Sequence, residues 1–294
     1  MSIKKFGPLL GIIILTIIVF FPSLNGGYLL TYDDNLQIVN NPDVLNLSWQ
    51  SVKNYFTTYY VRSYQPLASL SFGLEYYFFG PNPLVPHITN LVIHLLNVIV
   101  VFFLLNNLTP QLKDLNIFII TVFAIHPLQG ELLGWISTRS TLIVSFFMLL
   151  SILYYVKYVK SENKQNRYFW YSLVFFVLSL FSKPSSIILP FVLLLIDYLY
   201  RRRISIKLFV EKIPFFIGLF VIGIVSLISR KIYKAPVEEI ATQGYSEYYN
   251  LYEKIGIVSQ SIFLYLKKSF IPNDLIIYYG YPYRIGEDAT IGFS

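Results

Sequence analysis

Apolar runs of membrane-span length recur along this chain and limit the folds that it can adopt. The runs are about 16 to 22 residues long, which suits a helix that crosses a bilayer rather than a helix in a soluble core. Hydrophobic residues make up 55% of the chain and charged residues only 13%. The sequence therefore predicts an all-α polytopic membrane protein.

We expect a single multi-span domain, 1–294, with seven membrane-spanning helices. The spans are expected at 6–24, 88–106, 115–127, 132–156, 168–183, 185–200 and 208–229. An eighth apolar stretch, 255–266, is noted without being assigned as a span. The first two spans are separated by a large external loop, 25–87, and 230–294 forms an external or interfacial end.

The basic residues indicate how the spans are oriented. The net charge of +7 could suggest a nucleic-acid partner. However, the clusters Lys157–Arg167 and Arg201–Lys207 fall between spans on one side of the expected topology. The positive-inside rule places that side and the N-terminus in the cytoplasm. The charge therefore indicates orientation and contact with anionic lipids of the bilayer, and no nucleic-acid partner is expected.

Two adjacent acids stand near the start of the first external loop. Asp33 and Asp34 follow the apolar run that ends at Leu24. Carboxylates held close to a membrane span are candidates for proton transfer or for contact with a divalent cation. The alternative is a solvated turn, because Asp-Asp-Asn favours turns. The chain has no Cys, which excludes thiolate metal ligands and cysteine nucleophiles.

The same loop contains a predicted amphipathic helix. Ser48 is expected to cap it. Trp49, Val52 and Phe56 would share one face of this helix, and such a segment would lie along the bilayer surface.

Polar residues also occur inside the second predicted span. His87, Asn90 and His94 are spaced so that they follow one face of a helix. Two histidines seven positions apart are separated by about 10.5 Å along the axis, which argues against a shared zinc ion. We therefore expect His94 to form a hydrogen bond between helices.

Further titratable residues flank the ends of later spans. They are His126, Glu131, Arg139 and Lys183. Following the chain through the expected spans places all four on the same external side as Asp33 and Asp34. Acids and cations thus face each other at one membrane surface. Snorkelling at a span end is the alternative for Arg139 and for Lys183.

The order of these motifs carries a family resemblance. The motifs are Tyr32-Asp33-Asp34, Tyr64-Gln65-Pro66-Leu67, His87-Ile88-Thr89-Asn90, His94, Phe123-Ala124-Ile125-His126-Pro127-Leu128, Glu131, Trp135, Arg139, Ser182-Lys183-Pro184, Leu189-Pro190 and Asp197-Tyr198. Together they resemble the membrane glycosyltransferase region of the transmembrane and tetratricopeptide-repeat-containing O-mannosyltransferases and their prokaryotic relatives. The resemblance covers nearly the whole chain, and it indicates a prokaryotic cell-membrane protein.

The resemblance implies the type C glycosyltransferase fold, a helical membrane core with acidic catalytic residues in the first external loop. A sugar, mannose in the named family, would pass from a polyprenyl-phosphate carrier to an acceptor hydroxyl on the non-cytoplasmic side. Asp33 or Asp34 would orient or deprotonate that hydroxyl. The residues implied for binding the donor phosphate are His126, Arg139 and Lys183. Those implied for positioning the acceptor or the loop are Glu131, His87 and Gln65.

Several alternatives stay open. The acceptor could be a protein Ser or Thr or a glycan, and a divalent cation near Asp33 and Asp34 is neither required nor excluded. Gln65 stands where relatives often carry Arg or His, and no tetratricopeptide array occurs in 1–294, as in a fragment or a short form. The other functional classes are a lipid-linked-sugar flippase or transporter and an inactive membrane scaffold. Inverted repeats would favour transport, and none is visible.

Overall fold

The computed structural model describes residues 6–61, 63–161, 166–203, 205–232, 251–273 and 275. This part of the chain is predominantly helical. Within these residues, Tyr60 and Ser63 form an isolated antiparallel bridge. The prediction of an all-α protein is confirmed.

Each predicted span contains most of one helix, although 132–156, 185–200 and 208–229 also include parts of α7 and η4, of η5 and of α11. These helices are α1 (Gly7–Phe20), α5 (Leu84–Leu108), α6 (Lys113–Ile125), α8 (Arg139–Lys160), α9 (Asn166–Leu180), α10 (Leu189–Leu199) and α12 (Ile213–Ile232). Among the described residues, three stretches are long and apolar enough to cross a membrane: Gly7–Asn25, Leu84–Leu108 and Ile136–Lys160. The chain is therefore an integral membrane protein. The 13 residues of α6 rise only about 20 Å, less than the ~30 Å hydrocarbon core.

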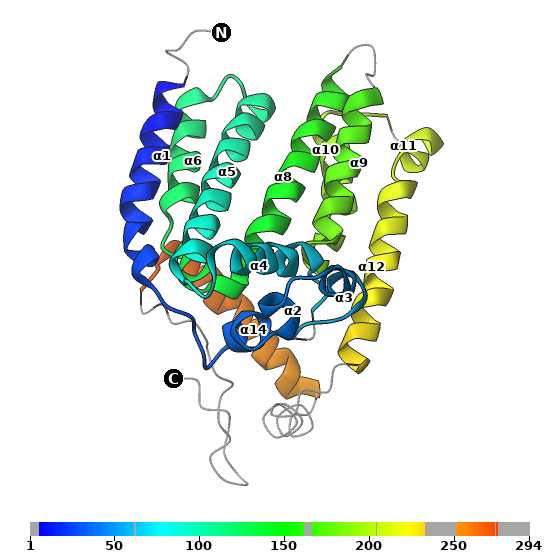
Figure 1. Cartoon of the computed structure of the whole chain (residues 1–294). Coiled ribbons are helices and arrows are strands. Elements are labelled where there is room, and N and C mark those ends of the chain that lie inside the picture. The colour runs from blue at the N-terminus through cyan, green and yellow to red at the C-terminus, as the bar shows by residue number, and fades with distance from the viewer. Residues whose placement is uncertain are drawn as a thin grey trace. The chain divides into compact units, whose positions relative to one another are not determined.

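The first external loop is folded into short helices. They are η2 (Phe21–Asn25), η3 (Asn35–Val39), α2 (Pro42–Leu45), α3 (Trp49–Thr57) and α4 (Pro66–Phe79). In Figure 1, α2, α3 and α4 lie across one end of the long helices. The predicted cap of α3 is confirmed, because the Ser48 hydroxyl accepts a hydrogen bond from the Ser51 amide at 3.1 Å. The folded loop 25–79, called the folded cap below, also carries Asp33 and Asp34.

Proline residues mark two breaks between the long helices. His126 leaves the helical conformation just before Pro127, and α6 ends there. The chain then forms two short elements, α7 (Gln129–Gly134) and η4 (Ile136–Thr138), before α8 begins. Lys183 is extended before Pro184, which starts η5 (Pro184–Ile188). Proline lacks an amide donor and restricts the preceding residue, so both breaks follow from local sequence.

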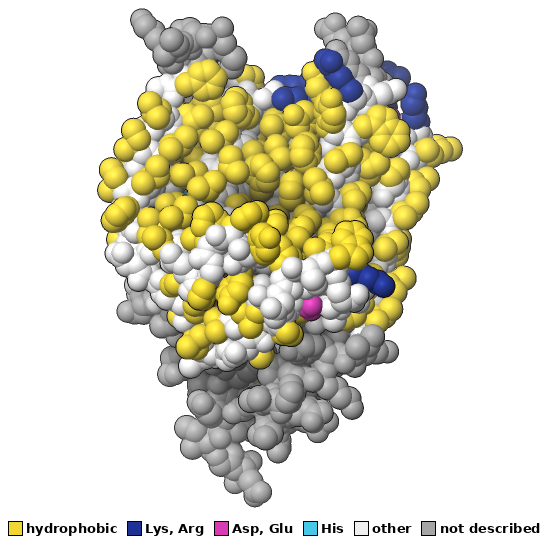
Figure 2. All heavy atoms as spheres, viewed as in Figure 1, with side chains coloured by type: hydrophobic (Ala, Val, Ile, Leu, Met, Phe, Trp, Pro, Cys, Tyr) yellow, Lys and Arg dark blue, Asp and Glu magenta, His cyan; other side chains and the backbone are white. Residues whose placement is uncertain are grey.

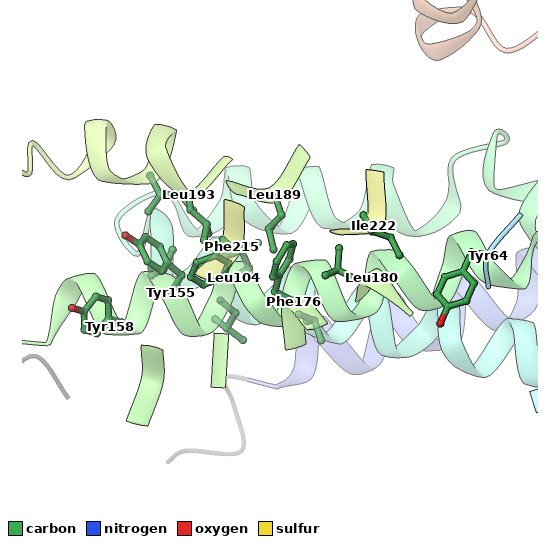
Figure 3. Close-up of a cluster of buried hydrophobic side chains, with 14 residues drawn as sticks. Tyr64, Leu104, Tyr155, Tyr158, Phe176, Leu180, Leu189, Leu193, Phe215 and Ile222 are labelled. Atoms are coloured by element: carbon green, nitrogen blue, oxygen red, sulfur yellow. The ribbon is translucent and has the colours of Figure 1, made fainter. Parts of the chain in front are cut away.

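The largest hydrophobic core joins α8, α9, α10 and α12. Figure 3 shows side chains of this core, among them Tyr155, Phe176, Leu193 and Phe215. Gly218 lets α12 approach α9 closely, because a Cβ atom at this position would lie 2.7 Å from the Phe176 ring of α9. The outer wall of the long helices is covered by apolar side chains in Figure 2. Lipid is the solvent that suits such a wall.

A buried charge network holds the opposite end of these helices. The Asp197 carboxylate forms ion pairs with Arg202 at 2.8 Å and with Lys212 at 2.6 Å. Arg202 also pairs with Glu211 at 2.9 Å. The Tyr155 hydroxyl donates to Asp197 at 2.8 Å. Opposite charges balance within the network, so α8, α10 and the start of α12 are fixed to one another here.

The chain divides into two compact units, Met1–Tyr233 and Lys234–Ser294. Within the second unit, α14 (Leu251–Phe270) is described. It contains the eighth apolar stretch, 255–266. The rest of the C-terminal segment, 233–250, 274 and 276–294, lies outside the described residues.

Candidate active site

Asp34 is buried and binds two backbone amides from distant parts of the chain. One carboxylate oxygen accepts a hydrogen bond from the amide of Leu29 at 2.9 Å. The other accepts from the amide of Ser137 in η4 at 2.8 Å. The side chain is fully buried. Asp34 therefore fixes the start of the folded cap against the segment that leads into α8.

Asp33, its neighbour, is half-buried and belongs to a different set of contacts. It interacts electrostatically with Lys183, which lies between α9 and η5. The Lys183 ammonium donates to the Thr141 hydroxyl in the first turn of α8 at 2.8 Å. Asp33, Glu131, Thr141 and Lys183 are called the acid–lysine cluster below.

Burial and charge act in opposite directions in the acid–lysine cluster. Burial lowers the pKa of Lys183, while Asp33 and then Glu131 act to raise it. Desolvation raises the pKa of Glu131, and Lys183 acts to lower it. Lys183 and the two acids therefore favour each other's charged forms, and the cluster brings together three residues that the sequence placed on one side of the membrane.

Arg139, at the start of α8, is fully buried and its guanidinium is occupied by protein groups. Its acceptors are Asn90 Oδ1 at 2.7 Å, Ser71 Oγ at 3.0 Å, the Pro86 carbonyl at 2.9 Å and the Glu75 carboxylate at 2.8 Å. The guanidinium carbon also lies 4.3 Å from the centre of the Phe72 ring. Arg139 thus joins α4, α5 and α8, and its role in binding a donor phosphate stays a prediction.

One face of α5 carries a row of polar side chains that bind carbonyl groups of other segments. The His94 Nε2 atom lies 2.8 Å from the Ala124 carbonyl oxygen, and the His87 Nδ1 atom lies 3.0 Å from that of Leu133. Asn90 and Asn97 donate to the carbonyls of Ile136 and Leu142 at 3.2 and 3.1 Å. The predicted hydrogen bond of His94 between helices is confirmed. This row anchors the irregular segment that contains Ser137.

Two further predicted residues form local or supporting contacts. Gln65, buried at the start of α4, donates to the Gln37 side chain at 2.8 Å, and so links α4 to η3. The His126 Nδ1 atom accepts from the Leu128 amide at 3.2 Å, within the turn after α6. Neither contact tests a role in binding donor or acceptor.

Three contributors to this region were not singled out from the sequence. Ser137 and Thr141 are ordinary polar residues near Arg139, and no motif marks them. Glu75 left a signal, because it is the sole charged residue between Pro66 and Phe79. A lone charge in an apolar helix needs a partner of opposite sign, and Arg139 is that partner.

The acidic side chains of this region are potential metal ligands. Among the residues that the structure describes, no three His, Asp or Glu side chains converge as a metal ion would require. A cation near Asp33 would need ligands from outside this set. The chemistry offered here is instead a carboxylate beside an ammonium group, which suits proton transfer next to a developing negative charge.

Comparison with known proteins gives relatives of one kind. The mouse protein O-mannosyl-transferase TMTC1 is 32% identical over 144 residues, which are 45% of this chain and 15% of that protein. The human protein O-mannosyl-transferase TMTC4 is 28% identical over 187 residues, 55% of this chain and 25% of the relative. The Caenorhabditis elegans protein O-mannosyl-transferase F38B6.6 is 27% identical over 205 residues, which are 66% of this chain and 28% of that protein.

These matches confirm the resemblance to the O-mannosyltransferases over 45 to 66% of the chain. The chain spans 15 to 28% of the length of these three relatives. No family model matches the chain, and no solved structure matches it.

Proposed function

We propose that this chain, as a relative of the TMTC protein O-mannosyl-transferases, is a membrane glycosyltransferase. It moves a sugar, mannose by analogy with the names of its relatives, from a polyprenyl-phosphate carrier to an acceptor hydroxyl of a protein or glycan. The observation that carries this proposal is the acid–lysine cluster. Asp33, Glu131 and Lys183 come from three separate segments, and both acids act electrostatically on Lys183.

The acid–lysine cluster supplies the two functions that sugar transfer from a phosphate requires. The Asp33 carboxylate takes the proton of the acceptor hydroxyl as the hydroxyl oxygen forms a bond to the sugar C1 atom. The bond between C1 and the phosphate oxygen breaks, and its electron pair leaves with the polyprenyl phosphate. The Lys183 ammonium compensates the charge that grows on this leaving group. Atoms and charge balance without a further reactant.

Asp34 is assigned a positioning role within the same proposal. Both of its oxygens are engaged by backbone amides, at 2.9 and 2.8 Å. With both oxygens engaged and the side chain fully buried, Asp34 is poorly placed to meet an acceptor hydroxyl. Asp33 is therefore the better candidate for the base, and Asp34 holds the backbone that presents it.

The distribution of basic residues supports a non-cytoplasmic location for this chemistry. Lys157 and Lys160 lie in the last turn of α8, opposite the end where Thr141 contacts Lys183. By the positive-inside rule the end with these lysines is cytoplasmic. N-glycosylation in eukaryotic microsomes tests this orientation, because Asn46 and Asn107 each begin an N-x-S/T acceptor sequence. Asn46, exposed beside α2, should accept glycan. Asn107, at the C-terminal end of α5, should not. Modification of Asn107 would reverse the orientation.

The decisive experiment uses the purified chain in liposomes with radiolabelled polyprenyl-phosphate mannose and a mixture of Ser/Thr peptides. Transfer of label to peptide is expected, and Asp33→Asn should reduce it by a factor of ~10² to 10⁴. Asp114→Asn, which changes an exposed acid at the start of α6, is the matched control. Movement of donor across the bilayer without transfer would favour a flippase. If the donor is neither used for transfer nor moved across the bilayer, an inactive scaffold is favoured.

A further inference from the structure

Two aromatic rings from the segments that carry Asp33 and Glu131 lie close to each other in a tilted arrangement. The ring centres of Tyr32 and Trp135 lie 5.4 Å apart, with planes inclined by 57°. Tyr32 directly precedes Asp33, and the Trp135 amide donates to the Glu131 carbonyl at 3.0 Å. The two rings therefore come from the same two segments that supply the two acids of the cluster.

The polar group of Trp135 has no partner among the residues that the structure describes. Its indole Nε1 atom is buried and finds no hydrogen-bond acceptor within the described part of the chain. Buried Trp N–H groups usually find an acceptor, so this donor calls for an explanation. In a membrane-interface belt the polar end of an aromatic side chain faces water instead. Trp135 differs from such a residue, because its N–H group is buried in the protein instead of facing water.

The backbone around both rings is held in place. Ser137, two residues after Trp135, donates its amide to Asp34 at 2.8 Å. Tyr32 lies in a turn in which its carbonyl accepts from the Asn35 amide at 3.2 Å. About 38% of Tyr32 is exposed. The pair is thus preorganised by Asp34 and is reachable by a ligand from the Tyr32 side.

We propose that Tyr32 and Trp135 form the platform that binds the sugar ring of the donor. This inference rests on the proposed function and names a subsite within it. The C–H groups on one face of a pyranose carry slight positive charge, which suits the negative face of an aromatic ring. The Trp135 indole N–H then donates to a sugar oxygen. A sugar held here lies beside Asp33, where the acceptor hydroxyl must lose its proton.

The first test needs no change to either ring. Trp49→Phe and Trp170→Phe together leave Trp135 as the single tryptophan, and both replaced side chains are exposed, at 84% and 58%. Tryptophan emission is then followed during titration with polyprenyl-phosphate mannose and, separately, with bare polyprenyl phosphate of the same chain length. The emission should change with the sugar donor and stay nearly constant with the bare carrier. Equal changes with both ligands, or no change with the bound sugar donor, would overturn the inference.

The second test compares affinities in variants of the pair. Tyr32→Leu and Trp135→Leu should each weaken binding of polyprenyl-phosphate mannose by roughly 3- to 10-fold, the range of a lost aromatic contact. Affinity for bare polyprenyl phosphate should stay unchanged, which also shows that the variants are folded. Tyr32→Phe keeps the ring and should restore sugar-donor affinity, and Trp170→Leu is the control at an exposed tryptophan.

The outcomes separate this inference from the proposed function. A variant that loses both ligands equally contradicts a sugar platform while leaving the phosphate site intact as a hypothesis. If the unmodified protein binds the sugar donor no more tightly than bare polyprenyl phosphate, the platform fails and the proposed function does not. If it binds neither ligand, the proposed function fails and the platform fails with it.

Discussion

The carboxylate of Asp34 accepts a 2.8 Å hydrogen bond from the amide of Ser137, a residue 103 positions further along the chain. Its other oxygen accepts from the Leu29 amide at 2.9 Å. This bond makes one acid of an adjacent pair a structural link between the folded cap and the entry to α8. Asp33, in contrast, interacts with Lys183. Two neighbouring residues of the same type therefore have separable roles.

Substitution of the two aspartates should separate stability from activity. Asp34→Asn replaces one acceptor oxygen with an amide donor, so one backbone N–H is left unsatisfied in a buried position. We expect a loss of about 1 to 3 kcal/mol in the free energy of unfolding. Asp33→Asn should leave unfolding close to that of the unmodified protein and reduce transfer. Thermal unfolding in detergent, measured beside transfer, checks both, and equal unfolding of the two variants would contradict the assignment.

Arg139→Gln should mainly destabilise the fold. The change removes the ion pair with Glu75, formed at 2.8 Å, and leaves that acid without its cation. Breaking a buried pair from one side costs about 3 to 5 kcal/mol. Denaturant unfolding of Arg139→Gln, Glu75→Gln and the double variant measures the coupling, and the double variant should lose less than the sum. Lys157→Gln, at the far end of α8, is the control.

The same variants also test the role that the sequence predicts for Arg139. Donor titrations can be made on the folded fraction of each variant. A stable Arg139→Gln protein that binds the polyprenyl-phosphate donor weakly would favour direct phosphate binding. An unstable protein whose folded fraction binds the donor normally would favour the structural role.

The helices were predictable because lipid imposes a simple pattern on sequence. A run of apolar residues has few alternatives to a helix in a bilayer, so the runs predicted the positions of α1, α5 and α8. The prolines at 127 and 184 explain the breaks after α6 and before η5, since each acts on its immediate neighbours. Ser48 predicted a cap for the same reason. These signals act within one turn or one span, where sequence and structure are closely tied.

The long-range partners could not be read from the sequence. Nothing near Asp34 indicates that Ser137 will supply the amide that it binds. Arg139 was expected to face a ligand, yet Glu75 meets it from α4, a helix that lies across the bundle end (Figure 1). Such pairings depend on how separate elements pack. The sequence placed Asp33 and Lys183 on one side of the membrane, while the structure adds that they interact.

Removal of Lys212 should destabilise the protein without affecting chemistry at the site. Lys212 is fully buried and pairs with Asp197 at 2.6 Å. Lys212→Met should lower the free energy of unfolding by about 1 to 3 kcal/mol, because Asp197 keeps Arg202 as its one remaining cation. Transfer per folded molecule should be unchanged, and Lys207→Gln, on the exposed side of α11 (Ile206–Val210), is the control. Reduced transfer with normal stability would contradict this.

Donor binding should depend on pH through Lys183. Burial lowers the pKa of Lys183 below that of an ordinary lysine, although Asp33 and Glu131 oppose the shift. As the pH rises through this lowered pKa, the ammonium loses its proton and affinity for the donor phosphate should fall. Lys183→Arg keeps its charge to much higher pH, so its donor affinity should stay level over the same range.

Stability should change in the opposite direction over that pH range. The unfolded chain holds the lysine proton more tightly than the folded chain does. The free energy of unfolding should therefore rise with pH between the lowered folded pKa and the ordinary value of about 10.4. Glu131→Gln removes a carboxylate that raises the pKa of Lys183, so the fall in donor affinity should begin at lower pH. Titrations of donor affinity and of thermal unfolding from neutral to alkaline pH measure both effects, and a fall in affinity that Lys183→Arg does not abolish would show that another group controls it.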